Sequence, residues 1–329
     1  MPKSSNPPAR VWISRGAFVL LGACSACGAA QQEVYPSRPL RFVVGFTPGG
    51  GSDLVARFLG QKLTERWGQP VVVDNRPGAG GNLANEIVFK AAADAYTVLI
   101  ASSSFTIQPA IYNNLSYKPQ TDFAPVSLAA SSPYLLVVHP SVAAQSVKEL
   151  IALAKARPGA INYSSSGAGS TIYLSFEFFK GMAGINIVHV PYRGGAEAVT
   201  AVVSGETSVS FLPLATALPQ ARQGRLRALA VSTAKRVPSL PEYPTVAEAG
   251  VPGYEFGTWY GVTAPAKTPK EVIAALHAAT VASLRNPEVL RRLNDLGYIP
   301  VGDTPEVFQA YIKSEVERLG KLIRAYKLA

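Results

Sequence analysis

The chain has 329 residues, of which 48% are apolar and 16% charged, so an intrinsically disordered protein is excluded and the length suffices for two ordinary domains. Its 28 glycines and 26 prolines indicate short elements joined by many tight turns. The formal net charge is +10, but no run of Lys and Arg interleaved with aromatic residues follows residue 35, so nucleic acid is a poor candidate partner.

The first thirty residues have the composition of an export signal. Arg10 and Arg15 precede the apolar run "GAFVLLGA", and small residues follow it. This run is about half of the ~20 residues that a membrane-spanning helix needs. The stretch from Leu21 to Cys24 resembles a lipoprotein-processing box, which would leave a lipid on Cys24, and ordinary cleavage near residue 29 or 30 is the alternative. In either case we expect residues 1–30 to be an export signal and the folded part to work in the periplasm.

From residue 38, short apolar runs alternate with stretches of helical periodicity, which is typical of α/β proteins whose parallel sheets are built from βαβ units. Between the first two runs, apolar residues from Leu54 to Trp67 recur at helical spacing and complete one such unit. The Pro-dense segment 236–256 is predicted to be a surface loop, because its prolines exclude a long helix. Three helical stretches end the chain. The predicted strands, which suit two sheets better than one, are 40–46, 69–75, 96–104, 133–140, 160–166, 186–192, 208–213, 226–232 and 257–265.

Four of these strands end in a loop rich in Gly or Ser that leads at once into a helix. Glycines let backbone N–H groups turn toward one point, and a helix start offers unpaired N–H donors and the positive end of its dipole. Each loop is therefore a candidate anion-binding corner. Because ligands gather at the carboxyl ends of strands in open α/β sheets, we expect the four loops to face one crevice. The loops are "GFTPGGGSDLVARF", "IASSSFTIQPAI", "NYSSSGAGSTIYLSFEF" and "VPYRGGAEAVTAVV".

The candidate ligand contacts in these loops also have plainer structural explanations. Ser52 is placed as the N-cap of the first helix and Asp53 lies in its first turn, so capping alone accounts for both. The serines 102–104 are either a polar strand end or hydroxyl donors to a ligand. Arg193 either pairs with a solute carboxylate or is an ordinary surface residue. By contrast, residues 164–171 carry five hydroxyls, more than a solvated turn needs, which favours ligand contact.

The sequence contains no motif for nucleotide, metal or catalytic chemistry. The glycine spacing fits neither of the two common phosphate-binding loops. The hydroxyl-rich loop lacks a nucleophile elbow, and no carboxylate pair lies in a Gly-rich loop. The three histidines form no metal-binding pair, and both cysteines lie in the predicted signal. We therefore predict that the protein is not an enzyme and has no cofactor or metal; the residues considered and set aside are His139, His189, His277, Cys24 and Cys27.

Over residues 35–329 these segments, in this order, resemble the extracytoplasmic receptors of tripartite tricarboxylate transporters, the Bug or TctC proteins. The resemblance implies a type II periplasmic binding-protein fold, with two parallel-type α/β lobes joined by two crossing segments near 131–137 and 254–261. One lobe would comprise 36–133 and 256–329, and the other 134–255. The markers are "YPSRPLRFVVGFTPGGGSDLVARFL", "GQPVVVDNRPGAGGN", "DFAPVSLAA", "LLVVHPSV", "INYSSSGAGST", "VHVPYRGGAEAV", "LRALAVSTAKRVPSLPEYPTVAEAGVPGYE" and "WYGVTAPAKTPKEVI".

The resemblance also implies a small carboxylate-bearing solute as ligand, membrane permease subunits as partners, and a monomeric receptor. The solute carboxylate would be held by loop backbone, small hydroxyls and ordered water, with little reliance on charged side chains. The predicted ligand contacts are Phe46, Gly50, Gly51, Ser52, Asp53, Ser102, Ser103, Ser104, Ser166, Gly167, Ser170, Thr171, Tyr192, Arg193, Gly194 and Leu212.

Two departures from the family pattern affect the expectations. Leu212 stands where relatives often have Asp, which disfavours a cationic or amino-acid ligand. Ala95 stands where Gly is frequent, which removes easy access to positive φ and predicts a slightly different turn. Two alternatives stay open: a receptor that reports solute occupancy to a signalling protein, and an enzyme on the same fold that uses Ser166 and His189.

Overall fold

The computed structural model describes residues 35–237 and 240–326. The predicted export signal, with Cys24 and its lipoprotein alternative, lies outside the described residues. Among the residues described, no helix combines the length and the apolar character needed to cross a lipid bilayer.

Every strand predicted from the apolar runs is present, and so are the three C-terminal helices. Segment 236–256 forms no helix over its described part, as its prolines predict. The strands are β1 (Leu40–Val44), β2 (Val71–Asn75), β3 (Thr97–Ser102), β4 (Phe123–Val138), β5 (Asn162–Ser165), β6 (Val188–Pro191), β7 (Val209–Pro213), β8 (Arg227–Val231), β9 (Gly257–Pro265) and β10 (Ile299–Pro300). The helices are α1 (Gly51–Trp67), the 3-10 turn η1 (Ala79–Gly81), α2 (Asn82–Phe89), α3 (Ser104–Ile111), α4 (Val147–Ala156), α5 (Thr171–Ala183), α6 (Gly195–Val203), α7 (Leu214–Arg222), α8 (Lys270–Leu284), α9 (Pro287–Asp295) and α10 (Pro305–Tyr326).

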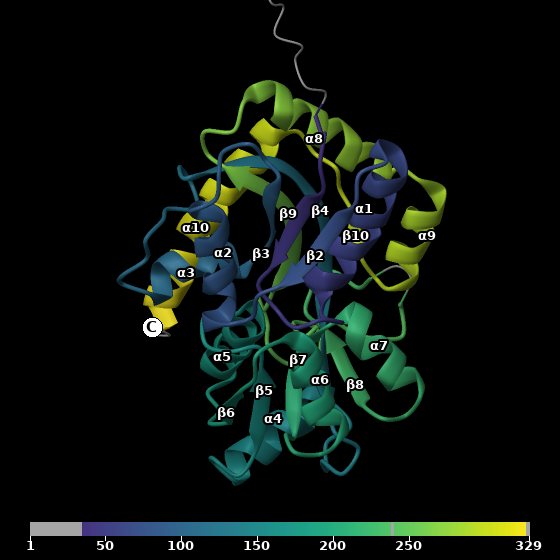
Figure 1. Cartoon of the computed structure of the whole chain (residues 1–329). Helices are drawn as coiled ribbons and strands as arrows, with labels where there is room; N and C mark the ends of the chain where they lie inside the picture. Colours follow the sequence, from purple (N-terminus) through teal and green to yellow (C-terminus); the bar gives the residue numbers. More distant parts are fainter. Residues whose placement is uncertain (1–34, 238–239, 327–329) are drawn as a thin grey trace, which may run out of the picture. The chain divides into compact units, whose positions relative to one another are not determined.

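The strands form two groups that share β4. The first strand group, β1, β2, β3, β9 and β10, lies in the upper part of Figure 1, and the second strand group, β5 to β8, lies in the lower part. Strand β4 pairs with β9 and β10 along its first part and with β7 and β8 along its second part. Contacts join the described part of the chain into one unit, so the predicted lobe boundaries stay a prediction.

The prediction of parallel pairing is right for two sets of three strands. β1 pairs in parallel with β2 and β3, and β5 pairs in parallel with β6 and β7. β4 and β9, however, are antiparallel to each other and to their other neighbours. The fold is therefore a mixed α/β fold. Strand direction was missed because a buried apolar run has the same pattern in either direction.

Each strand group packs its own helices over its apolar faces. Val55, Leu59 and Leu63 repeat every four residues on α1 and are buried in one cluster with Phe42 of β1. In the second strand group, α5 places Phe176 against the β5 and β7 side chains in a separate cluster. Because each strand group has its own packed core, the loops at its strand ends are held in fixed positions.

The turn before β3 keeps a left-handed residue although it lacks the glycine. Ala95 has φ 56°, and its carbonyl oxygen accepts a hydrogen bond from the Tyr35 hydroxyl at 2.9 Å. The Asp94 carboxylate accepts a bond from the Tyr96 backbone N–H at 3.0 Å. Ala95 therefore adopts a conformation that glycine prefers, and these bonds hold it there; whether the turn differs from that of relatives stays a prediction.

Replacing Ala95 by glycine is expected to raise the free energy of unfolding by about 1 kcal/mol, because a non-glycine residue in the left-handed region is strained by ~1–2 kcal/mol. Chemical denaturation of the two proteins measures the difference. The matched control is Ala278→Gly, on an exposed position inside α8, where glycine should lower stability by about 1 kcal/mol. A loss of stability in both variants would contradict the strain at Ala95.

Candidate functional site

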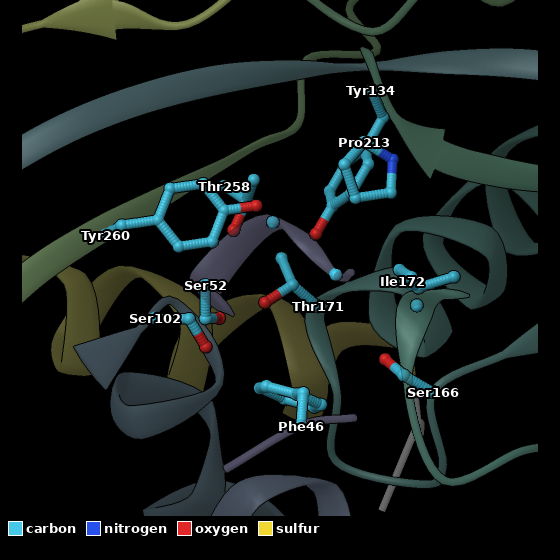
Figure 2. Close-up of a pocket in the computed structure, with 13 residues that line it drawn as sticks. Phe46, Ser52, Ser102, Tyr134, Ser166, Thr171, Ile172, Pro213, Thr258 and Tyr260 are labelled. Carbon is cyan, nitrogen blue, oxygen red and sulfur yellow. The ribbon is translucent and has the colours of Figure 1, made fainter. Parts of the chain in front are cut away.

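A narrow pocket lies where the two strand groups meet, and the 350 Å³ of empty space at it includes open solvent. Figure 2 shows its lining side chains, which come from both groups and from β4. All four predicted Gly- or Ser-rich loops contribute to it. The lining residues are Phe46, Gly50, Gly51, Ser52, Ser102, Tyr134, Ser166, Thr171, Ile172, Gly195, Pro213, Thr258 and Tyr260.

Three helices begin at this pocket. Gly51, Thr171 and Gly195 are the first residues of α1, α5 and α6, and all three line it. The first N–H groups of a helix have no acceptor within the helix, and the helix dipole makes this end positive. None of the thirteen lining side chains carries a charge. The pocket is therefore suited to an anion that is bound by peptide dipoles without a neighbouring cation.

Gly51 allows a close approach that a larger residue would prevent. The Tyr260 ring packs directly against it, so that a Cβ atom on Gly51 would lie 2.7 Å from Tyr260 Cζ. Tyr260 is only 3% exposed, and its neighbour Tyr298 donates a hydrogen bond to the Gly51 carbonyl oxygen at 3.2 Å. The start of α1 is thus fixed against β9.

Hydroxyl groups supply the remaining polarity of the pocket. The oxygens of Ser52, Thr171 and Thr258 surround the same space in Figure 2, and their residues are buried. Burial raises the pKa of Tyr134 above its usual value and that of Tyr260 well above it, so both phenols keep their protons at neutral pH. A protonated phenol can donate a hydrogen bond to an anion.

Asp53 lies behind the pocket rather than in its lining. Its carboxylate accepts hydrogen bonds from Gly49 N at 2.9 Å, Asn75 Nδ2 at 3.0 Å and Arg57 Nε at 2.9 Å. Burial acts to raise the pKa of Asp53, but the bonds from Arg57, Gly49 and Asn75 outweigh it and hold the pKa below its usual value. Through these hydrogen bonds Asp53 holds the loop in front of α1 in place.

The prediction that Ser52 caps α1 is wrong. The helix begins at Gly51 and its N-cap is Gly50, which has no side chain to make a cap bond, so Ser52 lies inside the first turn. Ser170, by contrast, caps α5: its Oγ accepts a bond from Tyr173 N at 3.2 Å.

Nine predicted ligand contacts lie outside the pocket lining. The Ser103 hydroxyl accepts a bond from Trp259 N at 2.8 Å, and Leu212 is fully buried in an apolar cluster. Arg193 is exposed. Whether any of the sixteen predicted residues contacts a ligand stays a prediction. The nine outside are Asp53, Ser103, Ser104, Gly167, Ser170, Tyr192, Arg193, Gly194 and Leu212.

Six lining residues were not predicted. Tyr134, Thr258 and Tyr260 lie on β4 and β9, and the predicted crossing segments already contained them. Segments that pass from one lobe to the other must also pass the crevice between them. The predicted crossing segments could therefore have indicated these three residues. Gly195 and Pro213 each follow a predicted residue by one position. The sixth is Ile172, in the first turn of α5.

The serine and histidine considered for an enzyme are not partners. His189 Nε2 lies 2.6 Å from the Oγ of Ser165, not from Ser166, and Ser165 is fully buried. Burial lowers the pKa of His189, and its ring stacks on Tyr163. Within residues 35–237 and 240–326, no group of three or more His, Cys, Asp and Glu side chains is arranged to hold a metal ion.

A mixed α/β fold with helix starts and hydroxyls gathered in an uncharged pocket is the architecture of a periplasmic solute-binding protein. The chain matches the family described as "Tripartite tricarboxylate transporter family receptor", TctC, over residues 55–328. It belongs to that family, whose members are solute-binding receptors.

Curated relatives and solved structures agree with this assignment. A Pseudomonas sp. (strain P51) protein from the tcbD-tcbE intergenic region is 39% identical, over 92% of this chain and 91% of its own, and BugT of Bordetella pertussis is 34% identical, over 93% and 94%. R. palustris Rpa4515, solved with adipate, is 38% identical with a TM-score of 0.86, covering 89% of this chain and 98% of its own. MatC from Rhodopseudomonas palustris, with bound malate, is 31% identical with a TM-score of 0.84, covering 88% and 100%.

Proposed function

We propose that this chain captures a small organic acid in the pocket between its two strand groups and presents it to the membrane permease subunits of a tripartite transporter. The observation that carries the proposal is the meeting of three helix starts, α1, α5 and α6, in a pocket without charged side chains. The adipate and malate bound by two similar proteins are both carboxylates, which supports the same ligand class here.

The two strand groups each supply half of the binding site. Gly51 and Ser102 belong to the first group, while Thr171 and Gly195 belong to the second. We propose that lobes 36–133 plus 256–329 and 134–255 move about β4 and the start of β9, so that an open form offers two half-sites and a closed form a complete one. A solute then shifts the population toward the closed form, because only that form makes both sets of contacts.

The same proposal includes the compartment and the oligomeric state in which the receptor works. The receptor works in the periplasm as a monomer, released there or held at a membrane by a lipid on Cys24. The closed form offers the permease a surface that the open form lacks.

Isothermal titration calorimetry and thermal unfolding with adipate and malate test the ligand class. A bound acid at 100 times its Kd should add ~2.7 kcal/mol to stability. The matched ligands are adipamide and malamide, which keep the length and most hydrogen-bonding groups but lack the charge. We expect the acids to bind and the diamides to fail, because helix starts favour an anion.

The outcome that counts against this function is diamides that bind as well as the acids, or no response to any short mono- or dicarboxylate. The variant Arg193→Ala distinguishes binding in the pocket from the alternative that the solute carboxylate pairs with Arg193. Because Arg193 is exposed and outside the lining, we expect its removal to leave the Kd unchanged within about twofold. A large loss of affinity would instead indicate that the solute carboxylate pairs with Arg193.

A further inference from the structure

Outside the pocket, the backbone of the first strand group's loops touches the backbone of the loop before α5. Gly80, in the 3-10 turn η1, has φ 62°, and a Cβ atom on it would lie 2.6 Å from the Ala168 carbonyl oxygen and 3.2 Å from Ser170 N. The obstructing atoms are backbone atoms, so no side chain can move out of the way. Only glycine permits this contact.

Tyr112 also contacts this segment, residues 168–170, from a second direction. It follows α3 directly, and its hydroxyl donates a hydrogen bond to the Ala168 carbonyl oxygen at 3.1 Å. Its ring lies over Gly169, where a Cβ atom would be 3.1 Å from Tyr112 Cε2. Two elements of the chain's first part, η1 and the end of α3, therefore meet on residues 168–170.

A buried polar network supports this contact from behind. Gln108 Nε2 donates to the Gly80 carbonyl oxygen at 3.0 Å, and Asn85 Nδ2 donates to Gln108 Oε1 at 2.8 Å. The Tyr117 hydroxyl accepts a bond from Asn85 Nδ2 at 2.8 Å, and its one proton is shared between Gln108 Oε1 and Asn82 Oδ1, the latter at 2.8 Å. Asn85, Gln108 and Tyr117 are at most 4% exposed. A buried hydrogen-bond network rigidifies its surroundings, so this one holds the Gly80 peptide in its orientation.

A similar close approach occurs at a second loop of the second strand group. A Cβ atom on Gly194, the N-cap of α6, would lie 2.8 Å from Thr47 N. The Thr47 hydroxyl oxygen is buried, and no hydrogen-bond partner for it is found among the described residues. The starts of both α5 and α6 are thus pressed against loops of the first strand group.

We propose that Gly80, Tyr112 and the Asn85–Gln108–Tyr117 network form a clasp, which holds the closed form by gripping residues 168–170. Because this segment leads directly into α5, the clasp also positions Thr171 at the pocket. These residues are positioning residues, since none of them lines the pocket. The clasp rests on the proposed two-lobe function and sets how long a captured solute is kept.

Double electron–electron resonance on the full chain measures the clasp directly. Spin labels go on Val72→Cys in β2 and Val188→Cys in β6, which are 52% and 47% exposed and lie at opposite ends of the strand order, with Cys24 and Cys27 replaced by serine. The variants are Gly80→Ala, Tyr112→Phe and the control Tyr243→Phe, whose ring packs on the core of the second strand group. Each is measured with and without adipate as the probe.

We expect the parent to show a short label separation that Gly80→Ala loses. Tyr112→Phe keeps its ring, so its ratio of short to long separations should fall about twofold to tenfold, the effect of one lost hydrogen bond. Its adipate dissociation should accelerate by the same factor with unchanged association, whereas Tyr243→Phe should match the parent. Thermal unfolding verifies that each variant is folded.

A folded Gly80→Ala protein with the parent's distance distribution overturns the clasp, and so does a parent that never shows the short separation. The distance measurement separates this failure from failure of the proposed function. If Gly80→Ala leaves both distances and adipate affinity unchanged, the clasp is wrong and the receptor stands. If no acid binds but the short separation still depends on Gly80, the ligand class is wrong and the clasp stands.

Discussion

Gly51→Ala is expected to weaken acid binding by about a hundredfold or more, which corresponds to ~2.7 kcal/mol. The added Cβ would lie 2.7 Å from Tyr260 Cζ, and Tyr260 is buried against Tyr298 with ring centroids 5.6 Å apart. Since the ring has no room to retreat, either it enters the pocket or the start of α1 moves away. Both outcomes displace the free N–H groups of α1. Calorimetric titration with adipate measures the loss.

The matched control is Gly60→Ala in the same helix. A Cβ atom on Gly60 would lie 3.2 Å from Val71 Cγ1, a side-chain atom that can shift, and alanine is the better helix former by about 1 kcal/mol. This variant should be as stable as the parent and bind with the same Kd. Equal weakening in both variants would show that α1 as a whole, and not its start, governs the affinity.

The loops of the pocket were predictable because their signals are local. A Gly- or Ser-rich loop between an apolar run and a helical pattern is visible within about fifteen residues, and all four such loops reach the pocket. The side chains on β4 and β9 were not predictable in the same way. Tyr134 lies 126 positions from Tyr260, and only the pairing of β4 with β9 brings them to one place.

The role of Asp53 shows a second limit of local patterns. The sequence left open whether its carboxylate caps a helix or contacts a ligand. Its hydrogen bond to Asn75 crosses from α1 to the end of β2, a contact that no local spacing indicates. Strand direction was missed for the same kind of reason, because pairing partners are distant in sequence.

An uncharged pocket suits a receptor that must release its solute. A buried cation without a partner would be costly in the empty receptor, and a strong ion pair would slow release. Helix starts and hydroxyls such as Thr171 and Thr258 can instead bond to water when the solute is absent. Discrimination then depends on the shape of the closed pocket and on how firmly the two strand groups hold each other.

Asp53→Ala is expected to lower the free energy of unfolding by about 2 kcal/mol at pH 7, because it leaves the N–H donors of Gly49 and Asn75 without their charged acceptor. The loss comes mainly from the bonds of Gly49 N and Asn75 Nδ2, since Arg57 is 52% exposed and solvent screens its ion pair. Urea denaturation at several pH values measures the effect. Asp295→Ala is the control, on an exposed residue at the end of α9, and should change stability by less than about 0.5 kcal/mol.

The pH dependence of this difference has a definite sign. The pKa of Asp53 is lowered in the folded protein, so its contribution is complete above the unfolded value of about 3.9 and is lost as the pH falls through the folded value. The gap between parent and Asp53→Ala should therefore be constant from about pH 6 to 8 and shrink below about pH 4. A gap that widened on acidification would mean that the folded protein favours the protonated acid, which the donors around this carboxylate oppose.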